Sequence, residues 1–92
     1  MADTYEQTRA DLARLLQQVG ASFPAEQTRY VEDFIDANEY QLALEWMLDG
    51  LIELDLPLPP DAEALARDLA SRLGVIGEIG ERLTRLESRR RT

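Results

Sequence analysis

Hydrophobic and polar positions along the chain follow the period of an α-helix. Apolar residues recur at three- and four-residue spacing in successive stretches, which places them on one side of each predicted helix. No stretch shows the strict alternation of a β-hairpin, and no internal repeat is visible. The pattern therefore predicts an all-α fold, a small bundle of four or five short antiparallel helices.

The first part of the chain predicts three helices. Gly20 is placed to end the first helix in the left-handed conformation that glycine adopts readily. The second begins near Pro24, whose fixed φ suits a first turn, and a turn containing Asn38 leads to the third, from about Tyr40 to Leu54. The positions predicted to face the core are Tyr5, Leu12, Leu15, Leu16, Val19, Phe23, Gln27, Tyr30, Val31, Phe34, Ile35, Tyr40, Leu44, Met47, Leu48 and Leu51.

A proline-rich connector precedes the last two predicted helices. Pro60 opens a fourth helix that Gly74 closes, and the stretch after it carries apolar residues at 3-4-3 spacing, like a short coiled-coil seam. We accordingly divide the chain into a helical domain, residues 1–75, and a C-terminal helix with an Arg-rich tail, residues 76–92. The seam could pack on the domain or form a homodimer with a second copy; its residues are Ile76, Ile79, Leu83 and Leu86.

Composition narrows the function classes. The 92 residues suffice for one small domain, and neither cysteine nor histidine is present, which excludes Ser-His and Cys-His hydrolases and zinc sites built on those residues. Carboxylates alone could hold Mg²⁺ or Ca²⁺, but the spacing of Glu32, Asp33, Asp36 and Glu39 suits no particular metal cage. We therefore expect a protein that is not an enzyme, with no catalytic residues, no metal and no cofactor.

Targeting features are also missing from the sequence. No apolar run approaches the roughly 20 residues that span a bilayer, and the N-terminal residues lack the apolar centre of a signal peptide. The absence of cysteine suits a reducing compartment. We expect a cytoplasmic protein that does not bind a membrane.

The net charge of −8 is concentrated in the middle of the chain. Residues 26–63 contain eleven acids and Arg29 as the only base, whereas residues 64–92 contain four acids and seven arginines. Such a negative body disfavours direct contact with nucleic acid. The terminal arginines could touch phosphate, but a short basic tail is more typical of a solubilising end.

The only tryptophan, Trp46, lies within this acidic stretch and shares a helical stripe with Glu39, Asp49 and Glu53. Two interpretations stay open. The acids could be the ordinary polar faces of amphipathic helices, with Trp46 covering a gap between helices. However, these helices have almost no basic residues four positions away to relieve repulsion. An acidic face with an aromatic centre would instead suit a cationic protein partner.

Residues 30–54 contain an acidic core, FID-N-EY-LALEW, within the segment RYVEDFIDANEYQLALEWMLDGLIEL that begins at Arg29. This core resembles the MafI family of immunity proteins, which accompany bacterial polymorphic toxins. The resemblance continues through LPLPPDAEAL and covers roughly residues 24–75. It implies a small cytoplasmic antidote that binds and neutralises a cognate toxin domain, often a nuclease, without catalytic residues of its own.

These observations lead to one hypothesis and one alternative. The hypothesis is an immunity protein of the kind known from toxin–antitoxin and contact-dependent inhibition systems, which binds a basic toxin domain through an acidic helical face. The alternative is a non-enzymatic helical interaction or oligomerisation module. The residues predicted to bind the partner are Glu32, Asp33, Asp36, Glu39, Glu45, Trp46, Asp49 and Glu53.

Overall fold

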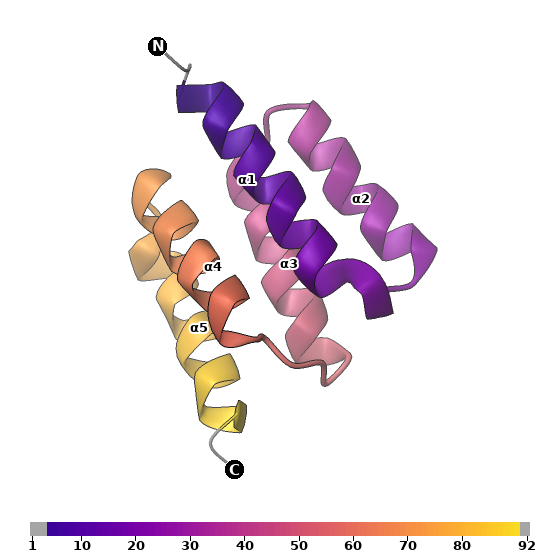
Figure 1. The fold of residues 1–92 in the computed structure, drawn as a ribbon, viewed down its shortest axis with the longest axis vertical. Coiled ribbons are helices and arrows are strands. Elements are labelled where there is room, and N and C mark those ends of the chain that lie inside the picture. The colour runs from indigo at the N-terminus through magenta and orange to yellow at the C-terminus, as the bar shows by residue number, and fades with distance from the viewer. Residues whose placement is uncertain (1–3, 91–92) are drawn as a thin grey trace.

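The computed structural model describes residues 4–90, which form five α-helices and one short 3₁₀ helix and contain no strand (Figure 1). The predicted all-α bundle is therefore confirmed. None of the helices in this range has both the length and the apolar character needed to cross a bilayer. The elements are α1 (Thr4–Val19), η1 (Gly20–Ser22), α2 (Ala25–Asp36), α3 (Tyr40–Glu53), α4 (Pro60–Arg72) and α5 (Ile76–Arg90).

Helix α3 is the centre of the bundle and contacts each of the other four α-helices. Helix α2 lies on one side of α1 and α3, and the α4–α5 hairpin lies on the other (Figure 1). The radius of gyration is 12.3 Å. A globular domain of this length is expected to have a value of about 12 Å, so α5 is folded onto the body of the domain.

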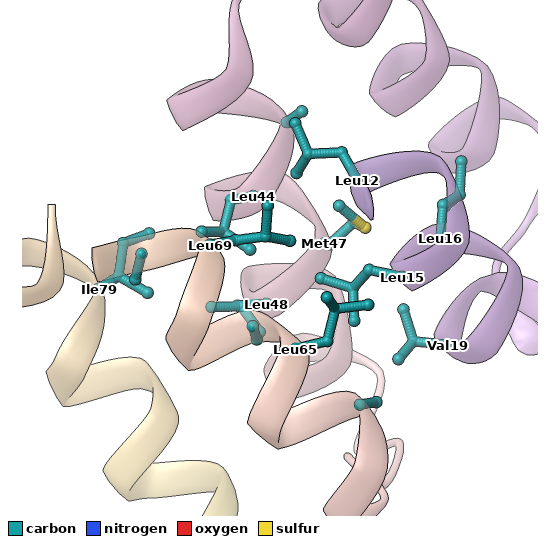
Figure 2. Close-up of a cluster of buried hydrophobic side chains, with 14 of the residues drawn as sticks. Leu12, Leu15, Leu16, Val19, Leu44, Met47, Leu48, Leu65, Leu69 and Ile79 are labelled. Carbon is teal, nitrogen blue, oxygen red and sulfur yellow. The ribbon is translucent and has the colours of Figure 1, made fainter. Parts of the chain in front are cut away.

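One continuous hydrophobic core joins the helices, and Figure 2 shows its centre. The leucines of α1 and α4 meet the inner face of α3, as the spacing of apolar residues predicts. Burying a leucine completely contributes about 1.5–3 kcal/mol, so these contacts dominate the stability of a small domain. The fully buried core side chains include Leu12, Leu15, Val31, Leu44, Met47, Leu48, Leu51, Leu69, Ile79 and Leu83.

The apolar seam of α5 packs inside the domain. Ile79 and Leu83 are fully buried, Leu86 is 3 % exposed, and all three belong to the core shared with α3 and α4. Only Ile76, which is 47 % exposed, remains accessible. Of the two roles that the sequence left open for the seam, packing on the domain is the one found here, and three of its four side chains are inaccessible to a second copy in this fold.

Three helices end in the same way. The residue after the last turn adopts a left-handed conformation at Asn38 (φ 63°), Asp55 (φ 57°) and Gly74 (φ 72°). The next amide then donates back to a carbonyl five residues earlier, as from Leu56 to the oxygen of Leu51 at 2.9 Å. This pairing satisfies carbonyls that the helix leaves without partners, and it reverses the chain within a few residues.

Helix α1 ends at Val19, directly before Gly20, as predicted, but the predicted left-handed conformation of Gly20 and the predicted burial of Tyr5 are wrong. Gly20 is absent from the residues with positive φ, because the chain continues from Val19 into η1, where the Phe23 amide donates to the Gly20 carbonyl at 3.0 Å. This tighter turn brings Phe23 into the core, where it is 8 % exposed. Tyr5, predicted to face the core, is 71 % exposed because it lies at the outer end of α1.

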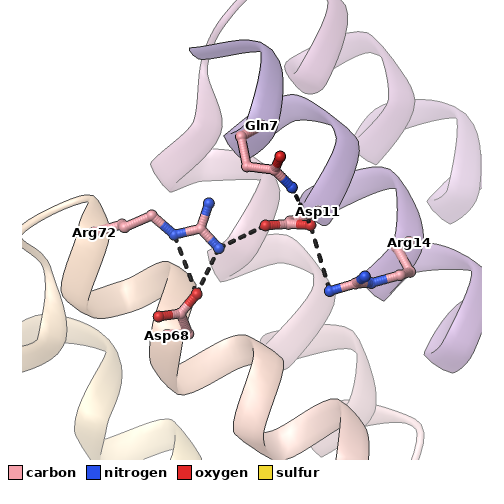
Figure 3. Close-up of polar contacts among 5 residues, drawn as sticks. All are labelled: Gln7, Asp11, Arg14, Asp68 and Arg72. Atoms are coloured by element: carbon pink, nitrogen blue, oxygen red, sulfur yellow. Dashed lines mark hydrogen bonds and ion pairs between the residues drawn. The ribbon is translucent and has the colours of Figure 1, made fainter. Parts of the chain in front are cut away.

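A buried carboxylate ties α1 to α4 (Figure 3). The Arg72 guanidinium donates to Asp11 at 2.6 Å and to Asp68 at 2.5 Å, and Gln7 donates to Asp11 at 3.1 Å. Burial disfavours the charged form of Asp11, but these hydrogen bonds and the charges of Arg72 and Arg14 outweigh that effect and hold the pKa of Asp11 below its ordinary value.

The arginines at the C-terminal end of the chain are used within the fold as far as the structure describes them. Arg67 bridges Glu63 on its own helix and Glu87 on α5, at 3.0 and 3.1 Å. Arg89 pairs with Asp55, at the end of α3, and is therefore part of the fold. The rest of the predicted Arg-rich tail lies outside the side chains that the structure describes.

Candidate functional site

Trp46 lies on the outer surface where α2 and α3 meet. Its ring centroid is 5.5 Å from that of Phe34 and 5.3 Å from that of Tyr30, and both pairs of rings are tilted, so the indole covers the half-buried Phe34 and packs against Tyr30. The residue nevertheless remains 37 % exposed. Both interpretations of Trp46 thus describe part of its environment, because it closes a gap between helices and also faces solvent.

Two further apolar side chains extend this surface. Tyr30 was predicted to face the core but is 45 % exposed, because it lies at the edge of the buried stripe of α2, next to α3. Leu42 is one helical turn before Trp46 and is 38 % exposed. We call Tyr30, Leu42 and Trp46 the apolar patch. Clustered apolar residues on a surface mark interaction sites more often than single ones do.

The close contact of α2 and α3 beneath the patch depends on Gly50. A Cβ atom at Gly50 would lie 2.9 Å from Gln27 Nε2 and 3.3 Å from the Phe23 ring. Without that atom, the Gln27 amide reaches over α3 and donates to the Trp46 carbonyl at 3.0 Å. Gly50 therefore marks a close approach of α2 and the preceding loop to α3.

Several of the predicted carboxylates surround the apolar patch. Asp33 follows Tyr30 by three residues on α2, and Glu53 follows Trp46 by seven residues on α3, so each lies on the stripe of its aromatic neighbour. Glu39 immediately precedes α3 and makes no side-chain capping bond. All three are exposed. Helical spacing thus places Glu39 and Glu53 on the Trp46 side of α3 and Asp33 next to Tyr30 on α2.

Two predicted residues face another way. Glu32 and Asp36 line a pocket between α1 and α2 together with Leu16 and Gln17 of α1. They lie on the side of α2 turned away from α3, whereas Trp46 is on the α3 side. The eight predicted residues therefore do not form a single patch.

Two other predicted residues, Asp49 and Glu45, lie on the α5 side of α3. Asp49 accepts a hydrogen bond from Arg82 Nε at 2.7 Å, and this bond, followed by the charges of Asp49 and Glu45, raises the pKa of Arg82 above its ordinary value. Glu45 accepts from Gln41 at 3.2 Å. The expectation that the central acids are unneutralised is therefore wrong for Asp49, whose partner comes from a helix 33 residues further along the chain.

Most of the acidic surplus nevertheless remains unpaired. Among the eleven acids of residues 26–63, Asp49, Asp55 and Glu63 form ion pairs with arginines of the last third. Within the described part of the chain, no ion pair reaches Glu26, Glu32, Asp33, Asp36, Glu39, Glu45, Glu53 or Asp61.

Some of these acids occupy positions that the helices themselves disfavour. Asp33 and Asp36 lie in the last turn of α2, and Glu53 is the last residue of α3, where the helix dipole is negative and no basic residue is present. Helix α4 shows the favourable arrangement, with acids in its first turn and Arg72 in its last. Helix stability therefore does not account for Asp33, Asp36 and Glu53.

The described side chains include no group of three or more acids arranged to hold a metal ion. Comparisons with other proteins add no relative: no family model matches the chain, and no curated protein or solved structure was found to be similar to it. The resemblance to the MafI family, which rests on the residues between Tyr30 and Leu54, stays a prediction.

Proposed function

We propose that this chain is a small immunity protein that binds a basic domain of a cognate toxin through the α2–α3 face and so neutralises it, without catalysing a reaction. The observation that carries the proposal is the apolar patch, Tyr30, Leu42 and Trp46, bordered by exposed carboxylates that make no ion pair within residues 4–90. The resemblance to MafI immunity proteins in this same segment supports the biological role.

Physical chemistry assigns different tasks to the two components of the face. The unpaired acids attract a cationic surface and accelerate association, most strongly at low salt. The aromatic side chains supply the apolar contact that slows dissociation, as buried Trp and Tyr commonly do at interface hot spots. The toxin is inhibited if this chain, once bound, covers the active cleft of the toxin domain.

The test first asks whether a protein with a basic C-terminal toxin domain is encoded beside this chain, and it then uses that domain as the binding partner. Affinity is measured by calorimetry and the association rate by surface plasmon resonance, both at about 50 and 300 mM NaCl, since charge-steered binding weakens as salt screens it. We expect Trp46→Ala to weaken binding by about 2 kcal/mol or more, and Asp33→Asn to reduce the association rate and its salt dependence. Glu32→Gln removes the same charge on the α1 side of α2 and is the matched control.

Two results would overturn the proposal. The first is a neighbouring toxin domain that neither binds this chain nor is neutralised by it in co-expressing cells. The second is binding that persists unchanged in Trp46→Ala and Asp33→Asn, because the α2–α3 face would then have no part in the complex.

No comparable observation supports the alternative function, an oligomerisation module. Its predicted seam is used for the core of the domain, with Ile79 and Leu83 fully buried.

A further inference from the structure

A pocket of about 280 Å³ lies beside Trp46 in the groove between α2 and α3. The residues that line it are Trp46, Asp49 and Glu53 of α3 and Gln27 of α2, with Gly50 between them. Small-molecule sites usually measure roughly 300–1,000 Å³, so this pocket suits one side chain of a protein better than a free metabolite.

We propose that this pocket receives an arginine side chain of the protein that binds the α2–α3 face. The inference rests on the proposed function, and it adds which chemical group of the partner is recognised. A guanidinium is planar, stacks on an indole and donates several hydrogen bonds in its own plane, whereas an ammonium is a compact point charge. A site that combines a tryptophan with two acidic residues matches the guanidinium more closely than the ammonium.

The two carboxylates differ in how far they are already used. Asp49 accepts from the chain's own Arg82, through Nε at 2.7 Å and Nη2 at 3.5 Å, which shows that this carboxylate can engage a guanidinium edge. Glu53 makes no hydrogen bond or ion pair in the part of the chain that the structure describes. Glu53 is therefore the acceptor available to an incoming arginine, with Asp49 adding negative charge.

The chain's own arginines also select the side from which a cation can approach. A second pocket shares Asp49 and Glu53 and is also lined by Glu81, Arg82 and Arg85 of α5. In that pocket, the acids Asp49 and Glu81 are already paired with Arg82 and Arg85, so it is less favourable for an incoming guanidinium. The pocket beside Trp46 has no basic side chain in its lining. An arginine attracted by Asp49 and Glu53 is thus directed against the indole.

The experiment uses three short blocked peptides, Gly-X-Gly, with X as arginine, lysine or citrulline, the uncharged isostere of arginine. Each is titrated into the full chain while the indole N–H resonance and the fluorescence of Trp46 are recorded; Trp46 is the only tryptophan, so both signals report binding next to this residue, and the Glu53→Gln variant assigns it to the pocket. We expect the arginine peptide to bind with a dissociation constant of about 1–10 mM, lysine to bind several-fold more weakly, and citrulline to leave both signals unchanged.

Variants assign the binding to Glu53. Glu53→Gln should weaken binding of the arginine peptide about three- to fivefold, the effect of one partly exposed ion pair. Glu32→Gln, which changes the net charge equally on the α1 side of α2, should change it less than twofold by the same reasoning about distance and screening. Glu53 is exposed at the end of α3, so Glu53→Gln should keep its fold, as a denaturant titration will verify.

The inference is overturned if no peptide shifts the Trp46 signals, if lysine binds as well as arginine, or if Glu32→Gln and Glu53→Gln act alike. These outcomes are distinguishable from failure of the proposed function. A toxin domain that binds Glu53→Gln as tightly as the unchanged chain but fails to bind Trp46→Ala refutes the arginine pocket and leaves the function in place. A pocket that selects arginine peptides in a chain that neutralises no toxin refutes the function instead.

Discussion

At the scale of single residues, Gly50 shows how one missing side chain positions the candidate site. Alanine at this position would gain about 1 kcal/mol of helix propensity. The added Cβ would, however, displace Gln27 from the Trp46 carbonyl and press on the buried Phe23 ring, and such overpacking costs about 1–3 kcal/mol. We expect Gly50→Ala to lower the free energy of unfolding by about 1 kcal/mol, measured by urea titration.

Gly80→Ala is the matched control for that prediction. Gly80 lies inside α5, has no positive φ, and a Cβ there meets nothing within 4 Å. The substitution should raise the free energy of unfolding by about 0.5–1 kcal/mol, since only the backbone propensity changes. Equal stabilisation by both alanines would show that α2 and α3 are not held together through Gly50.

Asp11 makes a pH dependence testable at one residue. Its pKa is lower in the folded protein than in the unfolded chain, so folding favours the carboxylate. This stabilisation is complete above the unfolded pKa of about 3.9 and is lost as the pH falls through the lower folded value. Asp11→Asn should lower the free energy of unfolding at pH 7 by about 1–3 kcal/mol, and the difference from the unchanged chain should shrink below about pH 4.

The control for Asp11 is Asp68→Asn, which removes the more exposed of the two Arg72 partners. The Asp68 side chain is 62 % exposed and that of Asp11 is 7 % exposed, so the loss at pH 7 should stay within about 1 kcal/mol. If both variants lost the same stability, burial of the Asp11 carboxylate would not explain its contribution.

Single residues also show where sequence periodicity is ambiguous. The spacing correctly placed Leu44, Met47 and Leu48 in the core, because residues in the middle of a stripe are buried whichever neighbours cover them. Tyr30 lies at the edge of its stripe, about 100° from Val31, and its exposure depends on how far α3 extends beside it. Periodicity alone cannot predict whether such a residue is buried. Tyr30 was therefore predicted to face the core, although it is exposed and belongs to the candidate site.

At the scale of elements, α5 gives the clearest prediction. Leu83→Ala should lower the free energy of unfolding by about 2–5 kcal/mol, because it opens a cavity where a fully buried side chain contacts the core. Ile76→Ala changes a 47 % exposed member of the same 3-4-3 pattern and should cost less than about 1 kcal/mol. Both effects should be independent of protein concentration, which unfolding curves recorded at two concentrations will check.

A different result would restore the alternative interpretation of α5. If the Leu83→Ala and Ile76→Ala losses were similar and grew with protein concentration, the helix would be stabilised by a second copy. Sedimentation of the unchanged chain would then show a dimer. The sequence could not separate these cases, since a seam against the domain and a seam against a second copy have the same spacing.

Helix ends were predictable where the residue at the end belongs to a type that favours a left-handed conformation. Gly74 and Asn38 were recognised as a helix end and a turn, because glycine has no Cβ to clash and asparagine tolerates positive φ. Asp55 adopts the same conformation at the end of α3, where the sequence pointed to the following prolines as the break. Gly20 shows the converse, since a glycine at a helix end can also continue into a 3₁₀ turn.

At the scale of the whole molecule, the sequence established how much negative charge there is but not where the fold neutralises it. The surplus in residues 26–63 is visible in the composition. Arg82 reaches Asp49, and Arg89 reaches Asp55, only because α5 folds back along α3. Likewise, Glu32 and Asp36 are close to Asp33 in sequence yet face α1. The predicted acidic face therefore exists only in part: Glu53 shares a pocket with Trp46, and helical spacing places Glu39 on the stripe of Trp46 and Asp33 next to Tyr30.

The unpaired charges should make stability depend on salt in a direction set by the whole molecule. Raising NaCl from about 10 to 150 mM shortens the screening length from roughly 30 to 8 Å, which weakens repulsion within a chain of net charge −8. We expect the free energy of unfolding to rise over this range. Asp33→Asn, which removes an unpaired charge from the negative end of α2, should raise it by about 0.3–1 kcal/mol at low salt and reduce the salt effect.

Asp49→Asn makes the same chemical change on α3 and should instead lower the free energy of unfolding. It breaks the ion pair with Arg82 that ties α3 to α5, so we expect a loss of up to about 1 kcal/mol. Thermal unfolding of both variants at the two salt concentrations measures the contrast. Stabilisation by Asp33→Asn together with weaker binding of the toxin domain would mean that this carboxylate serves binding at a cost to the fold. Destabilisation by both variants would mean instead that the carboxylates of α2 and α3 stabilise the fold. Asp33 could then not be assigned to binding on the ground that the fold does not need it.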